Sequence, residues 1–227
     1  MTENTTSPAE RARIIAALRT LDSCAISDAL DSYGLPGAVT ALQAMWPVGK
    51  VVAGRVRTVT AAAKTADGPS THIATPLVVI SEPDDVVVID NNGRIDVSCW
   101  GGLLAEAAVK QGIAGVIVDG ACRDVQECEA LALPLYARRA VPVSARGRIV
   151  QQAMDTPITV DGIAVETFDY VVADRNGIAF IKQADASRIV EFAQRIAERE
   201  ERMSAEVRGG RPVVEVMHDN QFPSVEK

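Results

Sequence analysis

Two short segments of this chain carry residue types that bind small charged groups. The first is Gly101-Gly102-Leu103-Leu104, which lies between a strand pattern and a helix pattern. Two glycines at the start of a helix let a ligand approach the backbone closely, and the free N–H groups there attract a carboxylate or a phosphate. A plain tight turn is the alternative interpretation of the same residues.

The second segment, residues 119–127, follows an apolar strand pattern and places a cation beside an anion. It contains Arg123 and Asp124 as neighbours, with Glu127 three residues later. An arginine can hold a carboxylate through two parallel hydrogen bonds, and an aspartate can ligate a hard divalent cation. The alternative is a surface ion pair, with Glu127 solvated on a helix.

Alternating strand and helix patterns surround both segments. The predicted elements are strands over residues 86–90, 115–120 and 134–138, an Ala-rich helix over 103–111 that ends at Gly112, and a short helix over 125–130. Strands connected through helices favour parallel pairing and right-handed crossovers. Ligands of such sheets bind beyond the carboxyl ends of the strands, which is where both segments lie.

The rest of the chain is predicted to form helices near both ends and a β-rich segment before the last helix. Ser7 and Pro8 favour the start of the first helix. The other expected elements are a helix that opens at Ser27-Asp28 and ends within residues 33–37, a strand over 51–60, a short helix over 72–79, strands over 158–160, 163–165, 170–173 and 178–181, and a charged helix from Asp185 to about Arg208. We predict a disordered tail over residues 1–8, a single domain over 9–210 and a C-terminal tail over 211–227.

Composition restricts the class of protein. The chain has 227 residues, 48% hydrophobic but only 4% aromatic, so Ala, Val, Leu and Ile must form most of the core, as in α/β proteins. A net charge of −7 argues against a nucleic acid as direct ligand. No apolar stretch approaches the roughly 20 residues of a membrane span, so no membrane association is expected.

The cysteines predict a reducing compartment. Cys24, Cys99, Cys122 and Cys128 form no CxxC pair, and the chain has only two histidines, which argues against a structural zinc site. Their small and apolar neighbours predict reduced, partly buried thiols, with Cys122 as a packed wall beside Arg123. The expected location is the cytoplasm.

The spacing of Gly102, 20 further residues, Arg123-Asp124, two residues and Glu127 resembles the motif of the class II pyruvate aldolases. This family includes 4-hydroxy-4-methyl-2-oxoglutarate and 4-carboxy-4-hydroxy-2-oxoadipate aldolases of aromatic compound degradation, and regulator of ribonuclease activity A. The resemblance covers roughly residues 21–210. It implies an α/β fold, a β/β/α sandwich resembling the phosphohistidine swivelling domain with flanking N- and C-terminal helices. It also implies a homotrimer or homohexamer with active sites at subunit interfaces.

The resemblance also implies a role for each matched residue. Asp124 would ligate Mg²⁺ or Mn²⁺, and Arg123 would bind the carboxylate or carbonyl oxygen of a pyruvyl unit. The backbone of Gly101, Gly102, Leu103 and Leu104 would hold its other end. The metal would act as a Lewis acid, Arg123 would stabilise the enolate, and a water would take the 4-hydroxyl proton. Oxaloacetate decarboxylation would be a side activity.

One departure from the family pattern concerns Gly102. Family aldolases often carry an acidic residue at this position, where it holds metal-bound water. The resemblance implies a second such acid on the C-terminal helix of a neighbouring subunit, for which Glu200 is the best match and Glu201 the next. Glu127 is a further candidate for holding water. A solvated, charged helix face is the alternative for Glu200 and Glu201.

Other functions remain open from the sequence. One is a non-catalytic regulator that binds a ribonuclease or another protein through an acidic surface. Another is a related metal-dependent lyase or decarboxylase for a different 2-oxo acid, which Gly102 makes plausible. Lys64, Lys110 or Lys182 could in principle form a Schiff base, and His72 could act as a base.

Overall fold

A single long strand, β3 (Val52–Ala63), organises the molecule. The computed structural model describes residues 6–217. It contains a nine-stranded mixed sheet of strand order β1-β11-β10-β3-β4-β5-β6-β2, with β7 also paired to β3. The other strands of this sheet are β1 (Ala38–Val39), β2 (Gln43–Ala44), β4 (Asp85–Asp90), β5 (Gly115–Cys122), β6 (Leu135–Ala140), β7 (Ile149–Met154), β10 (Tyr170–Ala173) and β11 (Ile178–Ile181). A separate hairpin is formed by β8 (Ile158–Val160) and β9 (Ile163–Val165).

The sheet has a parallel part and an antiparallel part. Strands β3, β4, β5 and β6 run parallel, as the alternation of strands and helices predicts. Strand β10 pairs antiparallel with β3, and β11 pairs antiparallel with β10. The carboxyl ends of β4 and β5 therefore lie at the same edge, which is where the two candidate segments begin.

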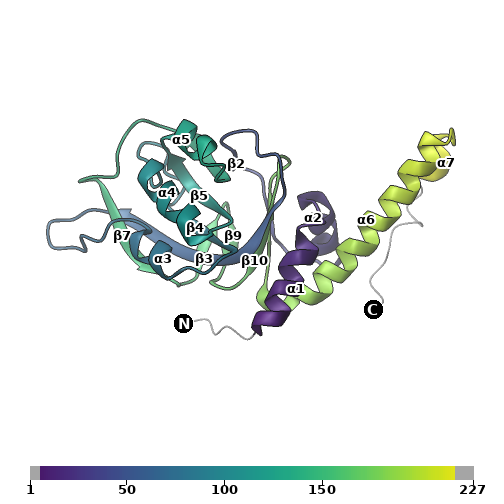
Figure 1. The fold of residues 1–227 in the computed structure, drawn as a ribbon, viewed down its shortest axis with the longest axis horizontal. Coiled ribbons are helices and arrows are strands. Elements are labelled where there is room, and N and C mark those ends of the chain that lie inside the picture. Colours follow the sequence, from purple (N-terminus) through teal and green to yellow (C-terminus); the bar gives the residue numbers. More distant parts are fainter. Residues whose placement is uncertain (1–5, 218–227) are drawn as a thin grey trace.

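Three hydrophobic clusters pack against the sheet. One joins the parallel strands to α3 (Thr75–Ile80), α4 (Gly102–Gln111) and α5 (Val125–Ala130). A second joins β10, β11 and Ala53 of β3 to α1 (Pro8–Leu18), α2 (Ser23–Ser32) and α6 (Ala186–Arg208). The third lies between the sheet and the β8–β9 hairpin. The two groups of helices occupy different regions of the molecule (Figure 1), which gives the predicted α/β fold with flanking terminal helices.

Most predicted elements agree with the structure, with local differences. Helix α2 begins at Ser23 rather than Ser27, because the Asp22 side chain accepts a hydrogen bond from the Ala25 N–H and caps the helix earlier. Helix α3 begins at Thr75 rather than His72, after Ala74 adopts a left-handed backbone conformation. Strands β1, β2 and β7 were not predicted, whereas α5 has the predicted bounds.

The chain ends are partly ordered. Ser7 caps α1 through a hydrogen bond from Glu10 N–H, and Pro8 is the first helical residue. A short helix, α7 (Val213–Val216), lies in the predicted C-terminal tail and buries Val216. Residues 1–5 and 218–227 lie outside the described part of the chain, so the prediction of tails there remains a prediction. No helix within residues 6–217 is long and apolar enough to cross a membrane.

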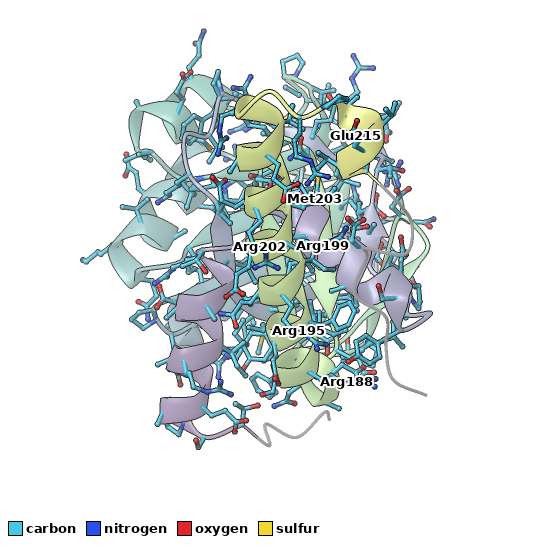
Figure 2. All side chains as sticks on the ribbon, turned by 90° about the vertical axis from the view of Figure 1, so that its right-hand side faces the viewer. Arg188, Arg195, Arg199, Arg202, Met203 and Glu215 are labelled. Carbon is cyan, nitrogen blue, oxygen red and sulfur yellow. The ribbon has the colours of Figure 1, made fainter. Side chains whose placement is uncertain are left out.

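Helix α6 is the longest helix and extends away from the sheet, with α7 at its far end (Figure 1). Its first half buries Ile189, Phe192 and Ile196 against the sheet and α2. Figure 2 shows Arg188, Arg195 and Arg202 spaced along the helix. The Arg188 guanidinium lies 4.7 Å from the centre of the Tyr33 ring. The charged helix predicted from Asp185 to Arg208 is therefore confirmed.

A candidate active site at two glycines and two carboxylates

The two candidate segments meet at the edge of the parallel sheet. Strand β5 ends at Cys122, and the next N–H, that of Arg123, donates a 3.0 Å hydrogen bond to the carbonyl of Trp100. The Cys99 N–H donates to the carbonyl of Ala121 at 2.9 Å. These two bonds join the loop before α4 to the end of β5. Gly101 and Gly102 therefore lie beside Arg123 and Asp124, as the sequence predicts.

Asp124 connects the two segments through its side chain. Its Oδ2 accepts a 3.0 Å hydrogen bond from the Gly102 N–H, at the amino end of α4, where the helix dipole favours a negative charge. The same oxygen lies 3.1 Å from Nε of Arg123. The backbone of Asp124 is left-handed, with φ 56° and ψ 41°, a conformation that aspartate adopts more readily than most residues other than glycine.

The two glycines provide room for carboxylates. A Cβ atom at Gly101 would lie 2.6 Å from Oδ2 of Asp124, and one at Gly102 would lie 1.5 Å from Oε2 of Glu127. The sequence predicts that the glycines allow the close approach of an external anion. In the structure the groups that lie against them are the protein's own carboxylates.

Several polar groups at the site retain unused hydrogen-bonding capacity. Within residues 6–217, no acceptor is recorded for the first-turn N–H groups of Leu103 and Leu104, and no donor for the Glu127 carboxylate. Leu103 is 83% exposed, so this residue of the first turn of α4 is open to solvent. The buried indole nitrogen of Trp100 also lacks a partner there. An anion could bind at these N–H groups, as the sequence analysis expects of this backbone.

The carboxylate oxygens of this site suit a hard divalent cation that keeps most of its water ligands. Asp124 and Glu127 offer carboxylate oxygens, the ligands that Mg²⁺ and Mn²⁺ prefer. Within residues 6–217, no group of three or more His, Cys, Asp or Glu residues could enclose a metal. Mg²⁺ is commonly bound through one or two carboxylates, with water and substrate oxygens as the other ligands, so these residues fit it.

Glu200 and Glu201 do not join this site within one chain. They line a pocket of about 400 Å³ between α6 and the α1–α2 region, together with Arg19 and Asp22. Burial, and then the like charges of Asp22 and Asp28, raise the pKa of Glu200. The role that the resemblance implies for Glu200 or Glu201 therefore remains a prediction about a neighbouring copy of the chain.

The lysines, His72 and Cys122, which are the other candidates for a nucleophile or a base, lie in different surroundings from this site. Lys182 forms an ion pair with Asp169 at 2.9 Å, and Lys64 and Lys110 are exposed. The His72 ring lies 3.1 Å from the Thr75 hydroxyl at the start of α3. Burial raises the pKa of Cys122 to about 12, which agrees with its predicted role as a packed wall. None of these observations supports a Schiff-base or thiolate mechanism.

A second cluster of charged residues, which is not predicted from the sequence, is formed by Asp119, Arg138 and Asp161. Nε of Arg138 donates to Asp119, and the Asp161 N–H donates to the other Asp119 oxygen at 2.9 Å. The cluster borders a pocket of about 270 Å³ with Asp90 and Thr159. Its members are far apart in sequence. The pairing of β5 with β6 brings Asp119 near Arg138, and the turn of the β8–β9 hairpin adds Asp161. The one sequence signal is that Asp119 ends an apolar run.

A family model and several known proteins are similar to this chain. The family model described as "RraA-like: Aldolase/RraA" matches residues 23–180. Protein DlpA of Legionella pneumophila is 27% identical over 206 residues, which are 91% of this chain and 33% of that protein. The chain therefore spans about a third of the length of DlpA. A Halalkalibacterium halodurans protein named "Putative 4-hydroxy-4-methyl-2-oxoglutarate aldolase" is 29% identical over 181 residues, 80% of this chain and 82% of that one.

A solved structure shares the fold over nearly the whole chain. An uncharacterized protein from Pseudomonas syringae pv. tomato superposes with a TM-score of 0.82 at 26% identity. The match covers 90% of this chain and 96% of that chain. The mixed sheet and its flanking helices are therefore an architecture that this chain shares with a solved protein.

Proposed function

Because the chain belongs to the RraA-like family, whose description joins aldolases with RraA, we propose that it is a divalent-metal-dependent carbon–carbon lyase. Its substrate is a 4-hydroxy-2-oxo dicarboxylic acid, and its product is pyruvate. The observation that carries this proposal is the arrangement of Asp124 and Arg123 at the amino end of α4. The Asp124 carboxylate is held by the Gly102 N–H, and the Arg123 guanidinium lies beside it.

Each residue of the site has a task in this proposal. The N–H groups of Leu103 and Leu104 bind the carboxylate of the pyruvyl unit. Asp124 holds Mg²⁺ or Mn²⁺, which when bound supplies positive charge that polarises the 2-keto oxygen. Arg123 donates to the same oxygen through its terminal nitrogens, for which no partner is recorded within residues 6–217. Its charge stabilises the oxygen as negative charge develops there.

The bond changes follow from this arrangement. A water takes the proton of the 4-hydroxyl, and the electrons of that O–H bond form the new carbonyl. The C3–C4 bond breaks, and its electrons move towards the 2-keto oxygen to give the enolate of pyruvate. Protonation at C3 then gives pyruvate. Oxaloacetate decarboxylation passes through the same enolate, so it is a side activity of the same site.

The active form in this proposal is a homotrimer or homohexamer, with Glu200 or Glu201 of one subunit facing the site of the next. Exposed apolar side chains support a contact surface near the site. Val79, Ile80, Leu103 and Val109 are 42–83% exposed on α3 and α4. A second exposed apolar group lies at the end of α6 and on or directly after α7, and contains Val207, Val213, Val214 and Met217. Apolar surface of this kind commonly marks protein–protein contacts.

Pyruvate release tests the proposal. The purified chain is assayed with 4-hydroxy-4-methyl-2-oxoglutarate and with oxaloacetate, and pyruvate is measured through lactate dehydrogenase. We expect release with Mg²⁺, loss of release with EDTA, and recovery when Mg²⁺ is restored. No release from either compound by a folded protein would contradict the proposal. The alternatives would then be a regulator of a ribonuclease or another protein, or a lyase for a different 2-oxo acid.

A further inference from the structure

Residues 130–154 form a basic segment in an acidic chain. They include Arg138, Arg139, Arg146 and Arg148 but no aspartate or glutamate, whereas the whole chain has a net charge of −7. The segment contains strand β6 and the loop that leads from β6 to β7. A local excess of positive charge attracts anions, and an arginine of this segment is available to bind one if its guanidinium has no partner within the protein.

The four arginines differ in what their guanidinium groups contact. Arg138 donates to two aspartates, and Arg148 donates to two carbonyl groups of its own loop. Arg139 and Arg146 are exposed, and neither guanidinium forms a hydrogen bond or an ion pair with another residue of 6–217. These two arginines are therefore the ones that can bind an external anion.

Arg139 lies at the carboxyl end of β6, beside the end of β5 from which the candidate site begins. It pairs with Ala121 of β5 in the parallel part of the sheet. The Cys122 thiol donates to the Arg139 carbonyl at 3.7 Å, and the Val141 N–H donates to the Cys122 carbonyl at 2.8 Å. Because Cys122 directly precedes Arg123, the backbone of Arg139 is held next to the strand end that carries the site.

The side chain of Arg139 lies on the face of the sheet that carries α4 and α5. Side chains alternate between the two faces of a strand. Leu135 and Ala137 of β6 belong to the hydrophobic cluster that packs against these helices, and Arg139 continues the same series. Tyr136 belongs to the cluster on the hairpin side, and Arg138 continues that series instead. The guanidinium of Arg139 is therefore on the same face as the amino ends of α4 and α5.

The order of the strands gives the substrate a direction across this edge. Strands β4, β5 and β6 are neighbours in the sheet, and adjacent strands lie about 5 Å apart. The N–H groups of Leu103 and Leu104 begin the helix that follows β4, Arg123 follows β5, and Arg139 is on β6. A substrate whose pyruvyl carboxylate is bound at α4 and whose 2-keto oxygen lies at Arg123 therefore extends its other half towards Arg139.

We propose that Arg139 binds the carboxylate of the substrate that lies beyond the cleaved C3–C4 bond. The site thereby selects 2-oxo acids that carry a second carboxylate over those that end in an apolar group. This inference rests on the proposed function and names the residue that recognises the distal part of its substrate. A guanidinium without another partner suits this role, since it can hold a carboxylate through two parallel hydrogen bonds.

The test is equilibrium binding of two 2-oxo acids to the full-length chain with Mg²⁺, measured by isothermal titration calorimetry. 2-Oxoglutarate and 2-oxopentanoate differ only in that a methyl group replaces the distal carboxylate. Neither carries the 4-hydroxyl group, so neither can undergo the aldol cleavage. We expect the wild type to bind 2-oxoglutarate at least about 10-fold more tightly than 2-oxopentanoate, which is the scale of a hydrogen-bonded charge pair.

Two variants and a matched control assign this preference to one side chain. Arg139→Ala should bind both compounds equally, through weaker binding of 2-oxoglutarate and unchanged binding of 2-oxopentanoate. Arg139→Lys keeps the charge but not the two parallel hydrogen bonds, so it should retain part of the preference. Arg146→Ala removes the same charge from the other exposed arginine of the segment and should keep the full preference. Attraction by the basic segment as a whole would lower the preference equally in Arg139→Ala and Arg146→Ala.

Three results would overturn the inference. These are a wild type that binds neither compound or binds both equally, an Arg139→Ala variant that is folded by circular dichroism and keeps the preference, or an equal loss in Arg146→Ala. The proposed function is tested separately, by pyruvate release. The expected binding pattern without pyruvate release would contradict the lyase and leave the role of Arg139 supported. Pyruvate release with an unchanged preference in Arg139→Ala would support the lyase and contradict the role of Arg139.

Discussion

Two clusters of arginine and aspartate lie on or directly after strand β5 and differ in how fully their polar atoms are bonded. In the first, Asp119 of β5 accepts from Arg138 of β6 and from the Asp161 N–H. Asp161 in turn accepts from the N–H groups of Thr40 and Ala41. In the second, Asp124 accepts one backbone hydrogen bond and lies beside the guanidinium of Arg123.

This difference in bonding distinguishes a cluster that stabilises the fold from one that is available to bind a ligand. The first cluster joins two strands, a hairpin and a loop, and both Asp119 oxygens are bonded, as expected for a buried charge that must be compensated. The second cluster keeps oxygens and N–H groups available beside an exposed turn. Backbone conformation does not separate the two clusters, because Asp161 of the first and Asp124 of the second both have a positive φ. The presence of arginine and aspartate side chains does not distinguish these two cases, whereas the number of bonded polar atoms does.

The largest expected effect is on catalysis, from Asp124→Asn. Asparagine tolerates the left-handed backbone and can still accept from the Gly102 N–H, so only the charge is removed. We expect pyruvate release to fall at least about 100-fold, roughly 3 kcal/mol, because the cation and its stabilising charge are lost. Thermal unfolding should change little. A variant with near wild-type release would show that the second cluster is not the active site.

The next effect is on stability, from Arg138→Ala. Asp119 would remain buried without its arginine, and we expect the free energy of unfolding to fall by roughly 2 kcal/mol. Urea titration measures this change, with Arg139→Ala as the control, an exposed neighbour that forms no ion pair with another residue of 6–217. Pyruvate release per folded molecule of Arg138→Ala should stay near the wild-type value. A large loss of release with unchanged stability would reverse the assignment of the two clusters.

A smaller effect concerns acid pH and Asp161. Burial acts to raise the pKa of Asp161, but hydrogen bonds from Ala41 and Thr40 and the charge of Arg138 outweigh it and lower the pKa below 3.8. A lowered pKa contributes stability above 3.8 that is lost as pH falls through the folded-state value. Asp161→Asn should therefore reduce the fall in unfolding free energy below about pH 4, as measured by urea titration. An equal fall of the unfolding free energy with pH in the wild type and in Asp161→Asn would contradict this prediction.

The smallest effect concerns Glu200, which belongs to neither cluster of one chain. Because its pKa is raised, its ionised form destabilises the fold at pH values above 4.5, and this penalty disappears below that value. Glu200→Gln should slightly increase the unfolding temperature at pH 7 but not at pH 3. Glu198→Gln, an exposed acid of the same helix, is the control. If Glu200 also contributes to the active site of a neighbouring subunit, Glu200→Gln should lower pyruvate release while it raises the unfolding temperature.

Much of the fold could be predicted because its elements depend on local patterns. Apolar runs such as residues 86–90 and the glycine at 112 determine strand and helix positions directly. Strand β7, with two glutamines after Ile149 and Val150, lacks a clear alternation and is stabilised by pairing with β3. The early start of α2 depends on a side-chain cap at Asp22, a signal present in the sequence but outweighed by the later Ser27-Asp28 pair.

The candidate site was predicted in its residues but not in its geometry. The sequence places Gly102, Arg123, Asp124 and Glu127 near one sheet edge. It gives no indication that the Glu127 carboxylate lies over Gly102, because that depends on the packing of α5 beside α4. The Asp119–Arg138–Asp161 cluster depends on strand register, which single-sequence patterns do not determine.

Strand β3 also affects the order in which the chain can fold. It contributes Val59 to the first hydrophobic cluster, Ala53 to the second and Val56 to the third. Its partner β10 lies more than 100 residues later in the sequence. During synthesis, the half of β3 beside β4 can pair early, whereas α1 and α2 must wait for β10 and α6 to emerge. Long-range pairing of this kind slows folding, so we expect the N-terminal helices to gain protection from hydrogen exchange after the parallel strands.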